Sequence, residues 1–228
     1  MTTHIGTKFL AIALICTALP LSPGLAGDRS VTITLLGDNF LNGGGLNPPD
    51  RFAARLSAAL GEAGDEVTVE SAGYQQTTRD GVYWLTKTSD GQALLADLSE
   101  HAVILELGQH DCGVGGTDLT LEKTRANIDQ MLNLLQAKGI PVLLVGADNF
   151  GDCGAEYSVA YRAMLPEVAS KHALEFYPDF VDGIRDRLDL RQAEIECVHP
   201  NELGEEVVVQ RMLPMVKTLV EQVAKVSS

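Results

Sequence analysis

The sequence is poor in basic residues. It contains 17 lysines and arginines against 31 aspartates and glutamates, and its formal net charge is −14 at pH 7. Nucleic acids and anionic membrane surfaces attract basic patches, so this balance argues against both as partners. A surface with this excess of acidic groups keeps a protein soluble.

Several other features are absent. The 228 residues contain no internal repeat, no linker rich in proline or serine and no low-complexity segment, which suits one globular domain. Gly43–Gly45 is not followed by Lys-Ser or Lys-Thr, so it does not match a phosphate-binding loop. No His-x-x-x-His pair occurs, and the sequence therefore predicts no cofactor and no metal site of that tight spacing.

An apolar run is confined to the start of the chain. Lys8 precedes the run Phe9–Leu21, which has the length of a signal-peptide core and is short for a bilayer span. Gly24–Ala26 offers small residues at the two positions that a signal peptidase reads. We expect a signal peptide at 1–26 and a domain at 27–228, with the mature protein periplasmic or secreted and not inserted in the membrane.

Three cysteines follow the expected signal peptide. Cys112, Cys153 and Cys197 would enter an oxidising compartment on export. Because three is an odd number, one disulfide and one free thiol form the simplest arrangement. The sequence leaves open which two of them pair.

Strand and helix patterns alternate along the remaining chain. Short runs rich in Val, Ile and Leu predict strands, and apolar residues at helical spacing predict helices. Asp50 and Thr120 are expected to cap two of the helices. Connections long enough to cross over predict a parallel five-stranded sheet with helices on both faces, a three-layer α/β sandwich of flavodoxin-like type. The expected strands are 31–37, 66–70, 102–107, 141–146 and 174–177, and the expected helices are 50–63, 92–98, 120–138, 156–172 and 201–225.

Several blocks of the sequence resemble the SGNH (GDSL) hydrolases. The first strand ends in Gly37–Asn39, where that family has Gly-Asp-Ser, and Leu105–Gly108 matches its third block. Gly139–Leu144, Tyr177–Val181 and His199–Asn201 are likewise similar to the exported branch that includes arylesterases, acyl thioesterases and lysophospholipases. The resemblance implies a serine nucleophile, a histidine base and an aspartate that orients it. It also implies an oxyanion hole made by the serine N–H, a glycine N–H and an asparagine amide.

Most of these functional positions differ in this chain, and only the histidine base is unchanged. A carboxamide nitrogen is delocalised into its carbonyl, so an asparagine is a very poor nucleophile. Losing the nucleophile of a serine triad costs on the order of a millionfold in turnover. We therefore expect a non-catalytic protein that binds a small acyl, ester or glycan-like ligand, or a protein partner that the sequence does not identify. In the resemblance, Asn39 occupies the position of the family's nucleophile and His199 that of its base. Glu196 occupies the position of the orienting aspartate. Gln75 or Gln76 occupies the position of the oxyanion-hole glycine, and His110 that of the oxyanion-hole asparagine.

The alternative is a carboxylic-ester or thioester hydrolase with a rebuilt site. The residues expected to converge at one end of the sheet, with the three cysteines near them, are His110, His199, Glu196, Asn39 and Asp38. Two imidazoles and a carboxylate could hold a zinc ion, whose bound hydroxide would replace the missing serine.

Two further sources of a nucleophile remain. Cys197 lies beside His199 in the sequence, but residues two apart on a loop rarely face each other. A hydroxyl of the second loop, such as that of Thr77 or Tyr74, is the other candidate for the attacking position.

The first test concerns export. If residues 1–26 form a signal peptide, protein recovered from the periplasm or medium of a bacterial host should begin at Gly27. Sequencing the amino terminus of the exported protein measures this. A mature chain that still begins at Met1 would show that the segment is not cleaved.

Overall fold

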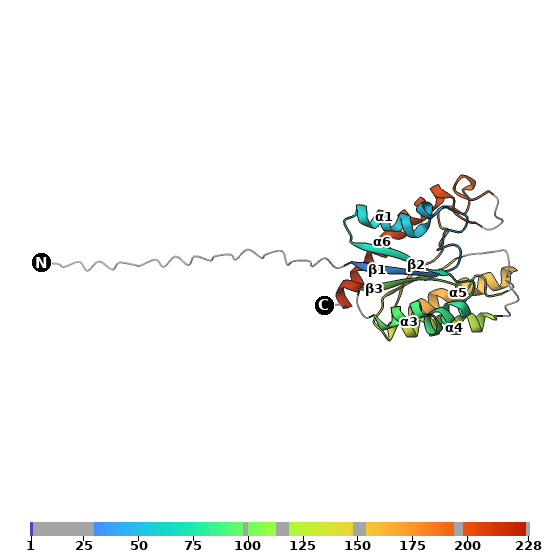
Figure 1. The fold of residues 1–228 in the computed structure, drawn as a ribbon, viewed down its shortest axis with the longest axis horizontal. Helices are drawn as coiled ribbons and strands as arrows, with labels where there is room; N and C mark the ends of the chain where they lie inside the picture. Colours follow the sequence, from blue (N-terminus) through green and yellow to red (C-terminus); the bar gives the residue numbers. More distant parts are fainter. Residues whose placement is uncertain (2–29, 98–99, 113–118, 148–153, 194–197, 227–228) are drawn as a thin grey trace.

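A five-stranded parallel sheet forms the centre of the molecule (Figure 1). The computed structural model describes residues 30–97, 100–112, 119–147, 154–193 and 198–226, together with Met1. The strand order is β2-β1-β3-β4-β5, which confirms the predicted fold class. The strands are β1 (Val31–Gly37), β2 (Val67–Tyr74), β3 (His101–Glu106), β4 (Val142–Val145) and β5 (Glu175–Tyr177).

Helices cover both faces of this sheet (Figure 1). One face carries α1 (Phe52–Glu62) and α6 (Glu202–Val226). The opposite face carries α2 (Thr78–Lys87), α3 (Ser89–Ala96), α4 (Leu121–Gln136) and α5 (Gly154–Lys171). Two short 3-10 helices, η1 (Pro48–Asp50) and η3 (Leu188–Leu190), lie in connecting segments. Within the described ranges, no helix is both long enough and apolar enough to cross a bilayer.

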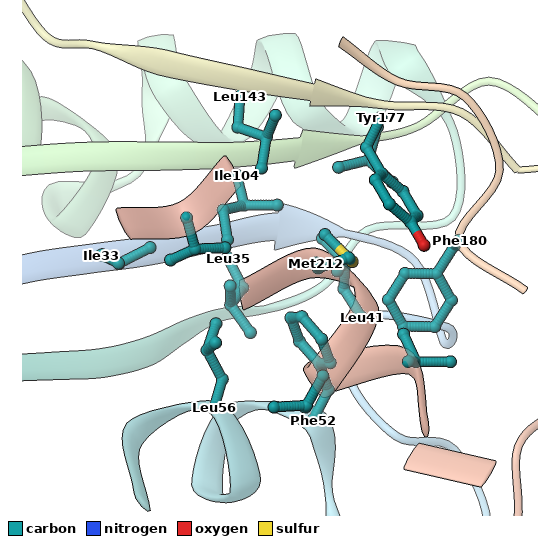
Figure 2. Close-up of a cluster of buried hydrophobic side chains, with 14 of the residues drawn as sticks. Ile33, Leu35, Leu41, Phe52, Leu56, Ile104, Leu143, Tyr177, Phe180 and Met212 are labelled. Carbon is teal, nitrogen blue, oxygen red and sulfur yellow. The ribbon is translucent and has the colours of Figure 1, made fainter. Parts of the chain in front are cut away.

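The two layers of helices bury separate hydrophobic clusters because side chains alternate along each strand. Ile33 and Leu35 of β1 point toward α1 and α6, whereas Leu36 points to the other layer. Figure 2 shows the first cluster, in which Leu56 of α1 and Met212 of α6 meet the strands. Each of these side chains is fully buried, and such burial stabilises the fold by about 1.5–3 kcal/mol per large aliphatic residue.

Some predicted boundaries are wrong. Thr120 caps α4 as expected, but Asp50 ends η1, and α1 begins after Arg51 without a side-chain cap. β2 continues past Glu70, because its pairing with β1 extends to Tyr74 opposite Gly37.

The segment after β2 forms two helices instead of the single helix expected at 92–98. The hydroxyl of Thr77 accepts from the backbone N–H of Asp80, whose carboxylate accepts from the N–H of Thr77, so α2 starts with a capping box. Thr88 caps α3 in the same position. The helices meet closely at Gly91, where an added Cβ atom would clash with the carbonyl oxygen of Trp84.

A buried carboxyl group lies between α6 and α1. Glu205 has no exposed surface, and neither of its carboxylate oxygens has a hydrogen-bond partner among the described residues. Burial raises the pKa of Glu205 to about 8, although the positive charge of Arg55 on α1 opposes the shift. The group is therefore neutral in the folded protein at neutral pH.

This buried carboxyl predicts a pH-dependent stability. Above about pH 4.5 the unfolded chain loses this proton while the folded chain keeps it until about pH 8, so the free energy of unfolding falls as pH rises through that window. The loss is about 1.4 kcal/mol per pH unit, or roughly 3 kcal/mol by pH 7. Glu205→Gln should recover this stability near neutral pH, and urea unfolding at about pH 5 and about pH 8 measures it. The exposed Glu206→Gln is the matched control, and equal behaviour of the two variants would contradict the assignment.

Candidate functional site

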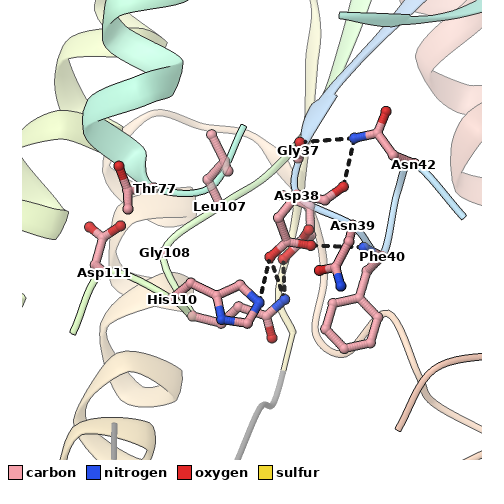
Figure 3. Close-up of polar contacts among 12 residues, drawn as sticks. Gly37, Asp38, Asn39, Phe40, Asn42, Thr77, Leu107, Gly108, His110 and Asp111 are labelled. Carbon is pink, nitrogen blue, oxygen red and sulfur yellow. Dashed lines mark hydrogen bonds and ion pairs between the residues drawn. The ribbon is translucent and has the colours of Figure 1, made fainter. Parts of the chain in front are cut away.

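The candidate site begins where β1 ends, at the carboxyl edge of the sheet (Figure 3). The amide nitrogen Nδ2 of Asn39 lies 2.7 Å from Nε2 of His199, 160 residues later in the chain. His199 is 4% exposed, and its ring stacks on that of Phe40 with centroids 4.6 Å apart and an interplanar angle of 9°. Asn39 and His199, which occupy the family's nucleophile and base positions, are thus in hydrogen-bond contact.

The direction of this hydrogen bond fixes the state of the imidazole. An amide nitrogen can only donate, so Nε2 of His199 accepts and the ring carries its proton on Nδ1. A serine hydroxyl would donate to the same lone pair. The amide carbonyl of Asn39 is buried and has no donor among the described residues.

His199 is held in place by the segment before it and by the start of α6. The N–H of Gln192 donates to the carbonyl oxygen of His199 at 2.9 Å. The side chain of Gln192 donates to the carbonyl oxygens of Gly44 and Pro200, at 2.8 Å each. Gln192 therefore joins the loop after β1 to the loop before α6, a role that the sequence did not reveal. Asn201 then caps α6 by accepting from the N–H of Gly204 at 3.0 Å.

Asp38 lies beside Asn39 and accepts hydrogen bonds from the loop after β1 and from the loop after β3 (Figure 3). Its Oδ1 accepts from the backbone N–H of Phe40 at 2.8 Å, and its Oδ2 accepts from the side-chain amide of Gln109 at 2.5 Å. Nε2 of His110 lies 3.5 Å from Oδ2 of Asp38. This ring nitrogen of His110, which the resemblance placed at the oxyanion hole, therefore faces a carboxylate.

Asp38 has a carboxyl neighbour at the end of β3. Asp38 and Glu106 are both fully buried, and Nε2 of Gln109 lies within 3.4 Å of Glu106 Oε1. Burial raises the pKa of Asp38, and the electrostatic interaction with His110 and the hydrogen bond from the N–H of Phe40 oppose that shift. Burial and the negative charge of Asp38 raise the pKa of Glu106 well above its usual range. Because two close carboxyl groups do not both ionise readily, a negative charge on either of these groups opposes ionisation of the other.

The loop after β3 is fixed from α2, α4 and α5. Asp111 accepts from the N–H of Thr78 at 2.8 Å and from the hydroxyl of Thr124 at 2.7 Å. Tyr161 donates its hydroxyl to the carbonyl oxygen of Leu107 at 3.0 Å. These buried contacts hold Gln109 and His110 between two anchored ends of the loop.

The loop after β2 directs its donors away from Asn39. The N–H of Gln75 donates to the carbonyl oxygen of Gly37 at 3.1 Å, which extends the β1–β2 pairing. That N–H is consequently used within the sheet. Thr77 is 1% exposed, and its hydroxyl donates to the carboxylate of Asp80 at 2.8 Å, so this hydroxyl belongs to the α2 cap and is not presented as a nucleophile.

Asn42 connects these two loops and was not anticipated from the sequence. Its side-chain nitrogen donates to the carbonyl oxygen of Asp38 at 2.6 Å and approaches those of Gly37 at 3.1 Å and Gly73 at 3.3 Å. Its carbonyl oxygen accepts from the hydroxyl of Ser71. Asn42 thus bonds the backbone of Gly37 and Asp38 (Figure 3) and links it to Ser71 and Gly73 at the end of β2.

Other expected site residues cannot be placed. Glu196, Cys153 and Cys197 lie outside the described residues. Within the part of the chain that the structure describes, no three His, Cys, Asp or Glu side chains are grouped as metal ligands.

Comparisons with known proteins agree with this architecture. A model of the GDSL-like Lipase/Acylhydrolase family matches residues 35–207. Esterase TesA of Pseudomonas aeruginosa is 26% identical over 204 residues, which cover 90% of this chain and 96% of that relative. A crystal structure of TesA aligns with a TM-score of 0.68 and 25% identity over 82% of this chain and 99% of that chain. AlinE4, an SGNH-hydrolase family esterase, aligns with a TM-score of 0.62 and 28% identity over 85% of this chain and 98% of that chain.

The position of Asn42 generates a stability test. Asn42→Ala removes the donor shared by three carbonyl groups and should lower the free energy of unfolding by about 1–3 kcal/mol. Urea unfolding measures the change. Asn133→Ala, on the exposed face of α4, is the matched control and should change stability by no more than about 0.5 kcal/mol. Equal effects of the two substitutions would show that Asn42 does not hold the loops together.

Proposed function

The chain belongs to the GDSL-like lipase/acylhydrolase family, and we propose that it is a member without serine-hydrolase activity that binds a small ligand beside Asn39. The observation that supports this most directly is the 2.7 Å contact between Asn39 Nδ2 and His199 Nε2. The lone pair that would take a proton from a nucleophile is engaged by an amide. That amide does not lose its proton at neutral pH and does not attack a carbonyl.

The expected size of the residual rate favours a complete loss of catalysis over weak remaining activity. Without its nucleophile, a serine hydrolase site keeps roughly 10³ to 10⁴ over the uncatalysed rate, owing to its oxyanion hole and binding. Here the N–H of Gln75 donates to Gly37, and Nε2 of His110 faces Asp38. Both contacts withdraw donors from the oxyanion position, so even this residual rate should be reduced.

The family supports the class of ligand that we propose. The relatives that match this chain over most of its length are esterases, namely TesA and AlinE4. The proposed ligand is therefore a small acyl, ester or glycan-like molecule.

A second candidate function is hydrolysis of a carboxylic ester or thioester by a rebuilt site around His199, Glu196 and His110, with or without a metal ion. One observation favours it. His110 is a second imidazole in the site and lies 3.5 Å from the carboxylate of Asp38, a pairing that orients a general base. Water would then be the nucleophile.

Export and a disulfide complete the proposal. The segment 1–26 supports a periplasmic or secreted location. We also propose that Cys112 pairs with Cys153 or Cys197, an arrangement that the disulfide-bonded state of Cys112 supports. The remaining cysteine would then be a free thiol.

Restoring the hydroxyl tests the proposed loss of the nucleophile. The native protein should neither react with a fluorophosphonate probe nor hydrolyse p-nitrophenyl butyrate above the background rate. Asn39→Ser should gain labelling, because its hydroxyl can donate to Nε2 of His199. Its turnover should stay low, since the serine oxygen is one bond closer to the backbone than Nδ2 and lies farther from the imidazole. Asn39→Ala is the control and should remain unlabelled.

The same assay separates the two candidate functions. Turnover by the native protein that disappears in His199→Ala would overturn the non-catalytic proposal and favour the rebuilt site. Loss of that turnover on treatment with a chelator would identify the metal-assisted form.

A further inference from the structure

A cavity of about 620 Å³ lies between the sheet and the helices α2 and α3, apart from the Asn39 site. Its walls include Thr34 and Glu70, which pair in the strand register of β1 and β2, and continue along Ser71–Gly73 toward the end of β2. Asn39, in contrast, follows the carboxyl end of β1. The cavity has the size of a site for a small organic molecule. The aromatic and aliphatic part of its wall is formed by Trp84 of α2 and Leu94 of α3.

The charged groups around this cavity are nearly all acidic. Glu70, Asp90 and Asp97 line it, and the described lining includes no lysine or arginine. His101 is the remaining ionisable group of the lining, and its Nε2 lies 3.2 Å from the carboxylate of Asp97. The hydroxyl of Thr34 donates to the carboxylate of Glu70 at 3.3 Å, which holds that carboxylate on the cavity wall.

We propose that this cavity binds a small organic cation, an amine or quaternary ammonium compound with an apolar body. The ammonium group would lie among the carboxylates, where the local charge complements its own. Trp84 is an aromatic residue of the wall, a type that attracts cations, and Leu94 offers apolar contact for the body of the ligand. The proposal concerns a site separate from Asn39 and does not depend on whether the chain is a hydrolase.

Binding of a ligand in this cavity can be measured through the fluorescence of the sole tryptophan of the chain. Because Trp84 is the one tryptophan in the sequence, its fluorescence reports on this cavity. Phenylbutylamine is the cationic probe, and phenylbutanol and phenylbutyrate are neutral and anionic probes of similar shape. The amine should change the emission saturably, with a Kd in the low millimolar range or below, as expected for a ligand of this size. It should bind at least about tenfold more tightly than phenylbutyrate, and its affinity should fall as salt is added.

Charge variants test the role of the carboxylates. Glu70→Gln with Asp90→Asn should weaken binding of the amine by about two- to fivefold for each carboxylate removed. Glutamine at position 70 can still accept from Thr34, so the wall itself should remain intact. The control is Glu62→Gln with Glu66→Gln, two exposed residues outside the cavity lining that give the same change in net charge.

Each alternative outcome overturns the proposal. An emission that does not respond to the amine would show that the cavity does not take this ligand. Equal binding of the amine and phenylbutyrate would show apolar binding without charge recognition. Equal weakening by the cavity variant and the control variant would assign the effect to net charge and not to these carboxylates.

Discussion

The hydrogen bond between Asn39 and His199 is the contact on which the chemistry of the site depends. It joins the end of β1 to the start of α6, and it fixes the imidazole as an acceptor at Nε2. A serine at the same place would supply a nucleophile whose hydroxyl could donate to the same lone pair, but its oxygen would lie farther from the imidazole than Nδ2 of Asn39 does. An asparagine keeps the geometry and removes the nucleophile, because its nitrogen donates a hydrogen bond but neither loses its proton nor attacks. In the proposed function, this side chain and the engaged donors of Gln75 and His110 together distinguish the site from that of an active hydrolase.

The supporting contacts are independent of which residue stands at position 39. Asn42 and Gln192 both hold the loop after β1 through backbone carbonyl groups. Asp38 is held by the N–H of Phe40 and by the amide of Gln109. None of these contacts uses the reacting side chain, so the scaffold can persist when the nucleophile changes. This explains how a chain can belong to a hydrolase family by fold and sequence while its activity is a separate question.

The sequence predicted the features that short-range patterns determine, such as strands and helix caps. It did not predict features that depend on contacts between residues far apart in the chain. The five strands and their parallel arrangement follow from apolar runs separated by helical segments, and Thr120 caps α4 because capping is local. β2 was predicted too short because the composition of residues 71–74 is that of a loop, whereas pairing with β1 uses the backbone. The family resemblance supplied the pairing of Asn39 with His199. The contact of His110 with Asp38 and the bridge from Gln192 to Gly44, 148 residues apart, require the folded chain and have no local pattern.

The state of the His199 ring separates the possible arrangements of this site. An amide donor requires the proton on Nδ1 and a lone pair on Nε2, and the contact is short enough for a direct bond. Nitrogen NMR of the labelled protein measures both ring nitrogens and the side-chain amide of Asn39. We expect an unprotonated, hydrogen-bonded Nε2 whose signal changes in Asn39→Ala. A proton on Nε2 in the native protein, or a ring signal unaffected by that substitution, would contradict the assignment of Asn39 as the donor that occupies this imidazole.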